Sequence, residues 1–295
     1  MKYSRFLLVS ALAIDAAIVH ALPAMGKWNT EELYRTPQSW PCEAFAAKSN
    51  QLSVVTKSGT VTARYVWLEG LAYKGKPTKF LACYAIPKAP DGKSVPAMVC
   101  VHGGNGTAYR EWVELWAKRG YAAIAMDTCG SIPIRDMKGQ WMSHPDGGPR
   151  GWGRPDLVDE PLEDQWPYHA VSTVALSHSF LRAQLGVDPE QIGITGLSWG
   201  GFLTCLAATV DKRFKFAVPV YTCAFYDTIG SAEGRRKTFG DVKWRRWLDL
   251  WDPKHYIPEI DMPIMWLSGT NDRSFPYGSL RKTFDLVKTP LDVVI

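Results

Sequence analysis

The sequence predicts an α/β fold, a mostly parallel, doubly wound sheet with an antiparallel start at its N-terminal end. From Val95 onward, short apolar runs alternate with helical segments, the pattern of a parallel sheet covered by helices on both faces. Three runs with partial alternation of apolar and polar residues precede Val95 and indicate antiparallel strands. Hydrophobic residues make up 46% of the 295 residues, which is enough to bury a sizeable core.

Each element is predicted from its own pattern. Continuous apolar runs such as Ala97–Val101 predict strands that are buried on both faces of a sheet. The amphipathic run from Tyr168 to Leu185 predicts a long helix. The predicted strands are 51–56, 61–69, 78–86, 97–101, 121–126, 191–195, 216–221, 262–267 and 291–295, and the predicted helices are 111–119, 168–185, 201–210 and 278–288.

Three regions are expected along the chain. Residues 1–21 are a predicted signal peptide, residues 22–94 an N-terminal extension with antiparallel strands, and residues 95–295 the main α/β domain. No internal repeat or low-complexity tract interrupts them. The chain is therefore expected to hold one large domain with a small addition before it.

The first 21 residues have the pattern of an export signal. Lys2 and Arg5 supply a positive start, an apolar stretch follows, and Val19-His20-Ala21 offers a cleavage site with small residues. Asp15 interrupts the apolar stretch, which is also short for a membrane span. A secreted or periplasmic protein without a stable membrane span is expected.

Composition excludes several other classes of function. The net charge of +5 is spread along the chain, whereas a nucleic-acid-binding protein would concentrate its basic residues on one face. There is no HExxH, no CxxC pair and no metal-ligand spacing among the histidines, so neither a metal nor another cofactor is expected. Cys83, Cys100 and Cys205 fall in predicted strands and a predicted helix, where buried thiols are the usual case.

The strongest motif is Gly196-Leu197-Ser198-Trp199-Gly200, which fits G-x-S-x-G. A predicted strand precedes it and a predicted helix follows it, so the chain must turn sharply and expose Ser198. The flanking glycines have no Cβ that could collide with neighbouring strands. The motif predicts Ser198 as a catalytic nucleophile, and the alternative is an ordinary serine in a turn.

A second motif, His102-Gly103-Gly104-Asn105-Gly106, directly follows the predicted strand at Ala97–Val101. A loop at this place supplies one N–H of an oxyanion hole, and the residue after the nucleophile supplies the other. The predicted donors are therefore the N–H groups of Gly104 and Trp199, with Asn105 as the alternative second donor. His102 is expected to orient the loop. A phosphate cradle is disfavoured, because the chain has no G-x-G-x-x-G or Walker pattern.

The third motif is Ser268-Gly269-Thr270-Asn271-Asp272, which follows the apolar run Ile264–Leu267. It comes after Ser198 in the order Ser…Asp…His, and a carboxylate there would orient the catalytic imidazole. Asp272 is therefore the predicted acid of a triad. The alternative is a residue that only forms an Asx-turn.

No histidine stands in the expected place. All six histidines precede Asp272, and the strand that should come before the catalytic histidine only begins at Leu291. Either the sequence is a fragment that ends inside its last strand, or the protein is a degenerate relative. We expect a fragment, because an apolar strand that stops without a cap would leave a poorly protected sheet edge.

These motifs resemble the α/β-hydrolase superfamily, and within it the branch of acetyl xylan esterases and prolyl-oligopeptidase-like enzymes. The resemblance covers Val95 to Ile295 and includes Asp188–Gly196, which leads into the nucleophile, and Trp251-Asp252-Pro253 before the Asp272 loop. It implies the α/β-hydrolase fold and a cofactor-free hydrolase that forms an acyl-enzyme. Trp199 departs from the Tyr, Met or Gln that often follows the nucleophile.

The resemblance implies a secreted serine esterase that cleaves acyl esters, with acetyl esters on plant polysaccharide fragments as expected substrates. A prolyl-oligopeptidase-like peptidase is the first alternative, although residues 22–94 are too few for a propeller of several four-stranded blades. An inactive carbohydrate-binding relative is the second. The sequence leaves the acyl group, the leaving group and the oligomeric state open.

Two long connections, residues 128–167 and 222–258, are expected at the edge of the site, where they would shape specificity. The chain has thirteen Trp, most of which we expect in the core, with a few as candidates for stacking on sugar rings. Trp244, Trp247 and Trp251 fall on one helical face, which favours packing against the domain.

Overall fold

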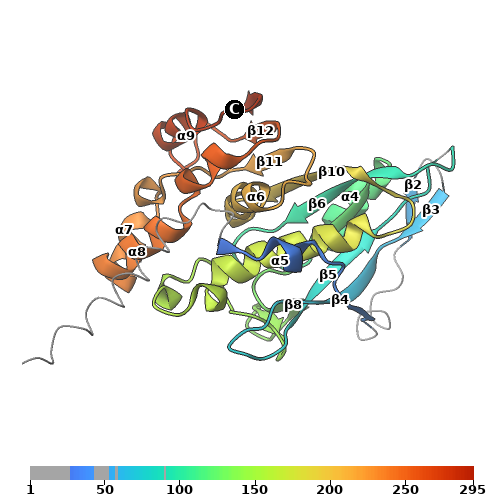
Figure 1. Ribbon diagram of the computed structural model, residues 1–295, viewed down its shortest axis with the longest axis horizontal. Helices are drawn as coiled ribbons and strands as arrows, with labels where there is room; N and C mark the ends of the chain where they lie inside the picture. The colour runs from blue at the N-terminus through green and yellow to red at the C-terminus, as the bar shows by residue number, and fades with distance from the viewer. Residues whose placement is uncertain (1–26, 43–52, 57–58, 90) are drawn as a thin grey trace, which may run out of the picture.

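A nine-stranded sheet runs through the protein, with the strand order β1-β4-β5-β7-β6-β10-β11-β12-β13 (Figure 1). The computed structural model describes residues 27–42, 53–56, 59–89 and 91–295, so the predicted signal peptide lies outside the described residues. The strands are β1 Ser39–Pro41, β4 Arg64–Glu69, β5 Lys79–Ala85, β6 Val95–Val101, β7 Ala122–Met126, β10 Val187–Leu197, β11 Ala217–Val220, β12 Ile264–Leu267 and β13 Leu291–Val294.

The sheet is antiparallel at one end and parallel over the rest. The pairs β1–β4, β4–β5 and β5–β7 are antiparallel, whereas every neighbouring pair from β7 to β13 is parallel. The predicted fold class, a mostly parallel sheet with an antiparallel N-terminal start, is therefore confirmed. The C-terminal ends of β6, β7, β10, β11 and β12 all point to one edge of the sheet, where such folds place their sites.

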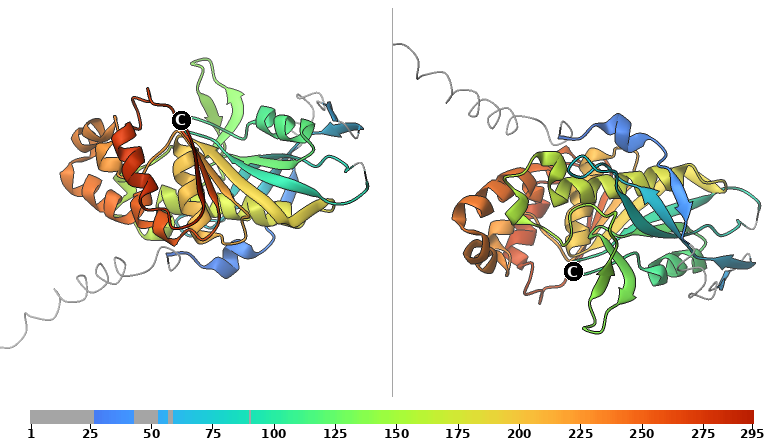
Figure 2. Two further views of the ribbon diagram at one scale, coloured as in Figure 1. Left: turned by 90° about the horizontal axis from the view of Figure 1, so that it is seen from above. Right: turned by 90° about the horizontal axis from the view of Figure 1, so that it is seen from below.

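Helices cover both faces of the sheet (Figure 2). Along β6, Val99 packs in the larger core cluster together with α5 and α6, whereas Met98 and Cys100 pack in a second cluster under α4. The side chains of this strand alternate because successive residues of a strand point to opposite faces. The helices that flank the parallel strands are α4 Arg110–Lys118, α5 Trp166–Arg182, α6 Trp199–Val210 and α9 Tyr277–Phe284.

The N-terminal region contains more structure than the sequence predicted. A short helix, α2 at Thr30–Tyr34, and the edge strand β1 precede residue 51, where the first element was predicted. The first predicted strand is not part of the main sheet, because β2 Ser53–Thr56 pairs only with β3 Gly59–Thr62 in a separate antiparallel hairpin. The predicted strand 61–69 is correspondingly split between β3 and β4.

The connection 128–167, predicted to be a loop, contains a β-hairpin. Strands β8 Ser131–Arg135 and β9 Trp141–Ser143 pair antiparallel and project from the body of the molecule (Figure 2). At the tip, the Asp136 side chain accepts hydrogen bonds from the N–H groups of Lys138 and Gln140, which closes the turn. Two 3-10 turns, Pro155–Leu157 and Leu162–Asp164, lead from the hairpin to α5.

The connection 222–258 also folds into helices, at one end of the molecule (Figure 1). Trp244, Trp247 and Trp251 are all buried, which confirms that they pack against the domain. The Trp247 indole N–H donates to the Gly153 carbonyl at 2.8 Å and thereby ties this connection to the first one. The elements are α7 Ala232–Phe239, α8 Asp241–Trp251 and the 3-10 turns Tyr226–Thr228, Pro253–His255 and Ile257–Glu259.

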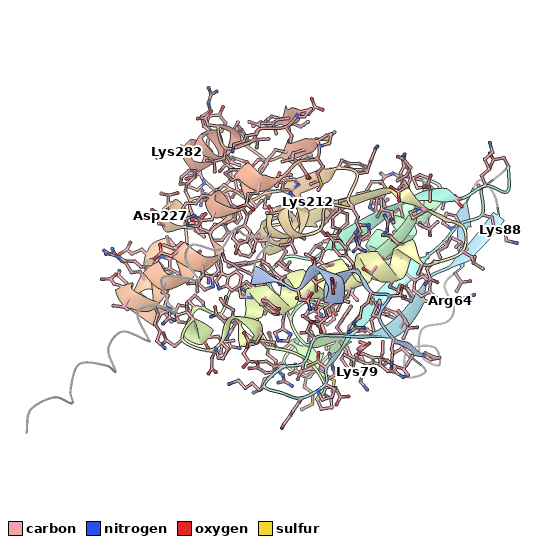
Figure 3. All side chains as sticks on the ribbon, viewed as in Figure 1. Arg64, Lys79, Lys88, Lys212, Asp227 and Lys282 are labelled. Atoms are coloured by element: carbon pink, nitrogen blue, oxygen red, sulfur yellow. The ribbon has the colours of Figure 1, made fainter. Side chains whose placement is uncertain are left out.

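The basic residues labelled in Figure 3 lie apart from one another, and the cysteines predicted to be buried are buried. Figure 3 shows the basic residues Arg64, Lys79 and Lys282 on separate parts of the molecule. Cys83 and Cys205 are buried thiols, as predicted.

None of the described helices has the length and apolar character needed to cross a membrane. The described residues contain no cluster of His, Cys, Asp and Glu side chains suited to a metal ion.

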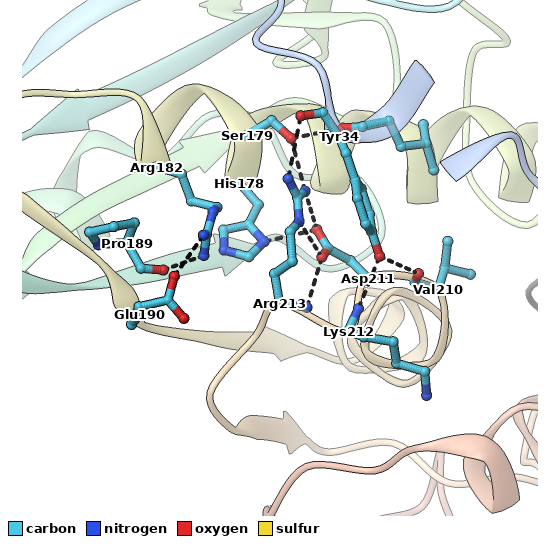
Figure 4. A network of polar contacts seen from close by, with 11 residues as sticks. Tyr34, His178, Ser179, Arg182, Pro189, Glu190, Val210, Asp211, Lys212 and Arg213 are labelled. Carbon is cyan, nitrogen blue, oxygen red and sulfur yellow. Dashed lines mark hydrogen bonds and ion pairs between the residues drawn. The ribbon is translucent and has the colours of Figure 1, made fainter. Parts of the chain in front are cut away.

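A buried polar network lies at the C-terminal end of α6 (Figure 4). The Asp211 carboxylate accepts hydrogen bonds from His178 Nδ1 at 2.8 Å and from Arg213 Nη2 at 2.7 Å. Arg213 also donates to Ser179 Oγ, so the network joins α5 to the end of α6. Burial disfavours the carboxylate, but His178 and Arg213 outweigh this effect and hold the pKa of Asp211 well below its usual value.

We expect Asp211→Asn to lower the free energy of unfolding by about 3–5 kcal/mol, because it leaves Arg213 without its buried counter-charge. Chemical denaturation at pH 7 measures the change. The folded pKa of Asp211 lies below the unfolded value of 3.8. The stability difference from wild type is therefore complete above pH 3.8 and shrinks as the pH falls below it.

Glu190→Gln is the control. Glu190 pairs with Arg182 at the surface, and loss of this pair should lower the free energy of unfolding by less than about 1 kcal/mol. Equal losses in the two variants would contradict the prediction.

Candidate active site

Ser198 occupies a strained turn between β10 and α6. Its backbone dihedrals are φ 58° and ψ −116°, a conformation that is costly for a residue with a side chain. The Ser198 N–H donates to the Val220 carbonyl at 2.8 Å, and the Ser198 carbonyl accepts from the Phe202 N–H at 3.0 Å. The serine is therefore fixed from both sides at the edge of the sheet where the parallel strands end.

The glycines around Ser198 are required by close packing. A Cβ on Gly200 would overlap the Val101 carbonyl of β6, and a Cβ on Gly201 would lie 2.7 Å from Thr222 Cγ2, just beyond β11. A Cβ on Gly196 would overlap the Gly200 carbonyl. The first turn of α6 thus rests directly on both neighbouring strands, a placement that only glycine permits at these positions.

The loop after β6 runs alongside the nucleophile. A Cβ placed on Gly103 would lie 3.4 Å from Ser198 Cβ, and one on Gly104 would lie 2.9 Å from Trp199 Cδ1. Trp199 is the first residue of α6, so its N–H has no acceptor within the helix. The Gly104 N–H donates to no described residue. The structure therefore brings the predicted oxyanion-hole donors next to Ser198.

Asn105 and His102 hold this loop in place. Asn105 has a positive φ of 57°, and its carbonyl accepts a hydrogen bond from the Trp141 indole at 2.9 Å. His102 is buried, accepts from the Thr128 N–H at Nε2 and donates from Nδ1 to the Gly103 carbonyl at 2.7 Å. Burial lowers the pKa of His102 to about 4, so its ring is neutral at pH 7. His102 therefore positions the loop, as the sequence suggested.

Asp272 lies in the loop that follows β12. Its Oδ1 accepts hydrogen bonds from the N–H groups of Ser274 at 2.8 Å and Phe275 at 3.1 Å, so the residue forms an Asx-turn. The side chain is half-buried, and its Oδ2 accepts no hydrogen bond from the described residues. One carboxylate oxygen thus shapes the loop and the other is left for a partner.

Tyr221 lies between the serine and the acid. Its N–H donates to the Leu267 carbonyl, so this residue sits where β11 ends beside β12. It has a positive φ of 47°, its side chain is 42% exposed, and its phenol oxygen would be 3.4 Å from a Cβ on Gly269. Tyr221 was not among the site residues predicted from the sequence. The sequence feature that could have pointed to Tyr221 as a site residue is its position at the end of a predicted parallel strand.

His144, His169 and His178 make their ring contacts with residues other than Ser198. His178 pairs with Asp211 at the far end of α6, about 18 Å from the serine by the rise of a twelve-residue helix. The rings of His144 and His169 stack edge-on against Trp67 and Tyr73. His255 is exposed in a 3-10 turn after α8.

Both long connections reach the site, as predicted. A Cβ on Gly104 would lie 3.0 Å from the indole nitrogen of Trp152, whose side chain is 38% exposed. On the other side, the Arg235 guanidinium of α7 lies 4.8 Å from the ring centre of Trp199. Sequence reasoning named the two connections but neither of these residues, because nothing in the local pattern distinguishes them from other Trp and Arg residues.

Residues 160–290 match the prolyl oligopeptidase family. The chain is 24% identical over 216 residues to the uncharacterized peptidase YuxL of Bacillus subtilis, covering 68% of this chain and 30% of that protein. It is 30% identical over 125 residues to the thiohydrolase aneE of Aspergillus aculeatus, covering 42% of this chain and 33% of that protein. The matches thus span about a third of the length of these relatives.

Solved structures show the same fold. An acetyl xylan esterase from Paenibacillus sp. R4 has a TM-score of 0.64 at 19% identity and covers 100% of this chain and 89% of its own. Acetyl xylan esterase 1 from Thermoanaerobacterium sp. has a TM-score of 0.68 at 16% identity, with coverage of 92% and 85%. An acylaminoacyl peptidase from Pyrococcus horikoshii has a TM-score of 0.61 at 19% identity, with coverage of 81% and 37%. Residues 160–290 are therefore similar to the prolyl oligopeptidase family, and the chain has the fold of these esterases and peptidases.

Proposed function

We propose that the protein is a secreted serine esterase that removes acyl groups, acetyl above all, from ester-bearing polysaccharide fragments. The observation that carries the proposal is the conformation of Ser198, which is held in a strained turn beside Gly103 and Gly104. Strain of this kind persists only where the surrounding structure enforces it, and it is typical of a nucleophile.

In the proposed mechanism, Ser198 Oγ attacks the ester carbonyl and the N–H groups of Trp199 and Gly104 stabilise the resulting oxyanion. A histidine acting as the general base takes the serine proton and passes it to the departing alcohol. Oδ2 of Asp272 orients that imidazole and stabilises its charged form. Water then hydrolyses the acyl-serine, which releases the acid and regenerates Ser198.

Both esterases and peptidases are among the proteins of similar fold. The two acetyl xylan esterases match over 89% and 85% of their own length, whereas the acylaminoacyl peptidase matches over only 37% of its length. A peptidase remains the second candidate, because residues 160–290 match the prolyl oligopeptidase family. For a carbohydrate substrate, the half-exposed Trp152 beside Gly104 offers a flat face on which a sugar ring could stack.

A labelling and turnover experiment on the complete protein tests the proposal. We expect a fluorophosphonate to modify Ser198, as read by peptide mass spectrometry, and acetylated xylo-oligosaccharide to be deacetylated faster than aminoacyl-amides are cleaved. Faster cleavage of the amides would favour the peptidase. Binding of the oligosaccharide without labelling or turnover would instead indicate an inactive carbohydrate-binding protein.

A further inference from the structure

Arg235 differs from every other half-buried arginine that the structure describes. The other five each pair with a carboxylate at 3.0 Å or less. Arg235 forms no ion pair with the described residues, and its one hydrogen bond runs from Nε to Ser231 Oγ at 3.3 Å. The five paired arginines and their partners are Arg35 with Glu69, Arg110 with Glu114, Arg154 with Asp156, Arg182 with Glu190, and Arg213 with Asp211.

The guanidinium of Arg235 is largely buried, and no carboxylate of the described residues pairs with it. The guanidinium lies over the Trp199 ring, and its Nη1 would be 3.1 Å from a Cβ on Gly153. This burial lowers the pKa of Arg235, while Tyr226 acts weakly in the opposite direction. Stacking on an indole recovers part of the lost hydration. A guanidinium has five N–H donors, and neither terminal nitrogen of Arg235 has an acceptor among the described side chains and backbone groups.

This cation is adjacent to the reacting centre. The Trp199 indole extends from Gly104, which lies near its Cδ1, to Gly153 and Arg235, which lie near its Cη2 edge. One ring therefore separates the proposed oxyanion hole from the guanidinium. Because Trp199 is itself buried, a substrate with its ester at Ser198 would pass beside Trp152 and Gly153 to reach Arg235 with its other end.

Most of the other basic side chains of α7 and α8 are paired with acids, unlike Arg235. Residues 231–251 contain six basic and three acidic side chains. Arg236 and Lys237 are paired with acids of the same segment, Asp241 and Glu233. Lys243 and Arg246 both pair with Asp159 of the first connection, so Arg235 and Arg245 are the basic side chains of this segment that form no ion pair among the described residues.

We propose that Arg235 binds a carboxylate on the alcohol part of the substrate, so that the enzyme prefers acyl esters of acidic alcohols such as uronic acid sugars. The planar guanidinium suits a carboxylate, because it can donate two parallel hydrogen bonds to the two oxygens. The charge belongs to the alcohol part because an acetyl group carries none. This proposal rests on the proposed esterase function and specifies its substrate class.

The test uses two esters that differ in a single charge, 4-acetoxybenzoate and 4-acetoxybenzamide. We expect the complete wild-type enzyme to hydrolyse the carboxylate with a kcat/KM about tenfold to a hundredfold above that of the amide, the range expected for a hydrogen bond to a charged group. Arg235→Met should abolish this preference by raising the KM for 4-acetoxybenzoate. The rate of ester hydrolysis of 4-acetoxybenzamide should stay within about twofold of wild type. Arg235→Lys should restore part of the preference, since a point charge remains.

Arg236→Met is the matched control, because Arg236 is its exposed neighbour on α7 with Asp241 as partner. Calorimetry in the Ser198→Ala background repeats the comparison by binding alone, so the result does not depend on chemistry. The absence of a wild-type preference, an unchanged preference in Arg235→Met, or an equal loss in Arg236→Met would each overturn the proposal. In all three cases the esterase function would stand if the acetyl ester of 4-acetoxybenzamide is hydrolysed. Failure to hydrolyse either ester would reject the esterase function, and the binding preference would then decide the role of Arg235 by itself.

Discussion

Replacing Ser198 with alanine should lower kcat/KM for an acetyl ester by at least about 10⁴-fold, and by up to about 10⁶-fold. The reason is that Ser198 Oγ forms the covalent bond to the acyl group, a step that no neighbouring side chain can take over. The variant should also resist the fluorophosphonate. Steady-state hydrolysis of an acetyl ester and intact-mass measurement after labelling give the two results.

Ser268→Ala is the control for this substitution. Ser268 follows β12 at the same edge of the sheet, and its buried hydroxyl has no hydrogen-bond partner among the described residues. Removing that hydroxyl should leave both activity and labelling close to wild type. Full activity in Ser198→Ala would show that another group carries the reaction and would overturn the mechanism.

Replacing Asp272 with asparagine should lower kcat by about 10⁴-fold, because an amide at the triad position favours the wrong tautomer of the histidine. The substitution is informative because the Asx-turn can remain. The asparagine oxygen can still accept from the N–H groups of Ser274 and Phe275, as Oδ1 of Asp272 does. The loop geometry should therefore persist while the negative charge is lost. A pH–rate profile and a thermal unfolding curve separate the two effects.

Asp272→Ala serves as the comparison, since it removes both the charge and the Asx-turn. We expect it to lose about as much activity as the asparagine variant and, in addition, about 1 kcal/mol of stability from the lost turn hydrogen bonds. If Asp272→Asn retains wild-type activity while Asp272→Ala loses stability, Asp272 is a turn residue only and the triad acid lies elsewhere.

The parallel strands and the helices between them could be predicted because each has a strong local pattern. Ala97–Val101 is continuously apolar and Tyr168–Leu185 has a helical pattern, and the structure has β6 and α5 there, although α5 is buried on nearly all sides rather than amphipathic. The hairpin β8–β9 could not be predicted in this way, because its strands are short and its side chains are only partly buried. Its register depends on the Asp136 turn and on the Trp141 contact with Asn105.

The sequence by itself determined the fold class and the turn that presents Ser198. Glycines at 196, 200 and 201 around a serine, between an apolar strand and an apolar helix, permit only a tight strand-to-helix turn, and that information is local.

Only the tertiary structure decided what surrounds that serine. Trp152 and Arg235 are separated from Ser198 by many residues in sequence, and no pattern in the sequence marks them. They meet at Trp199 because Trp247 ties the two connections together through Gly153. Contacts of this kind depend on how side chains from distant segments pack, which hydrophobic periodicity does not encode.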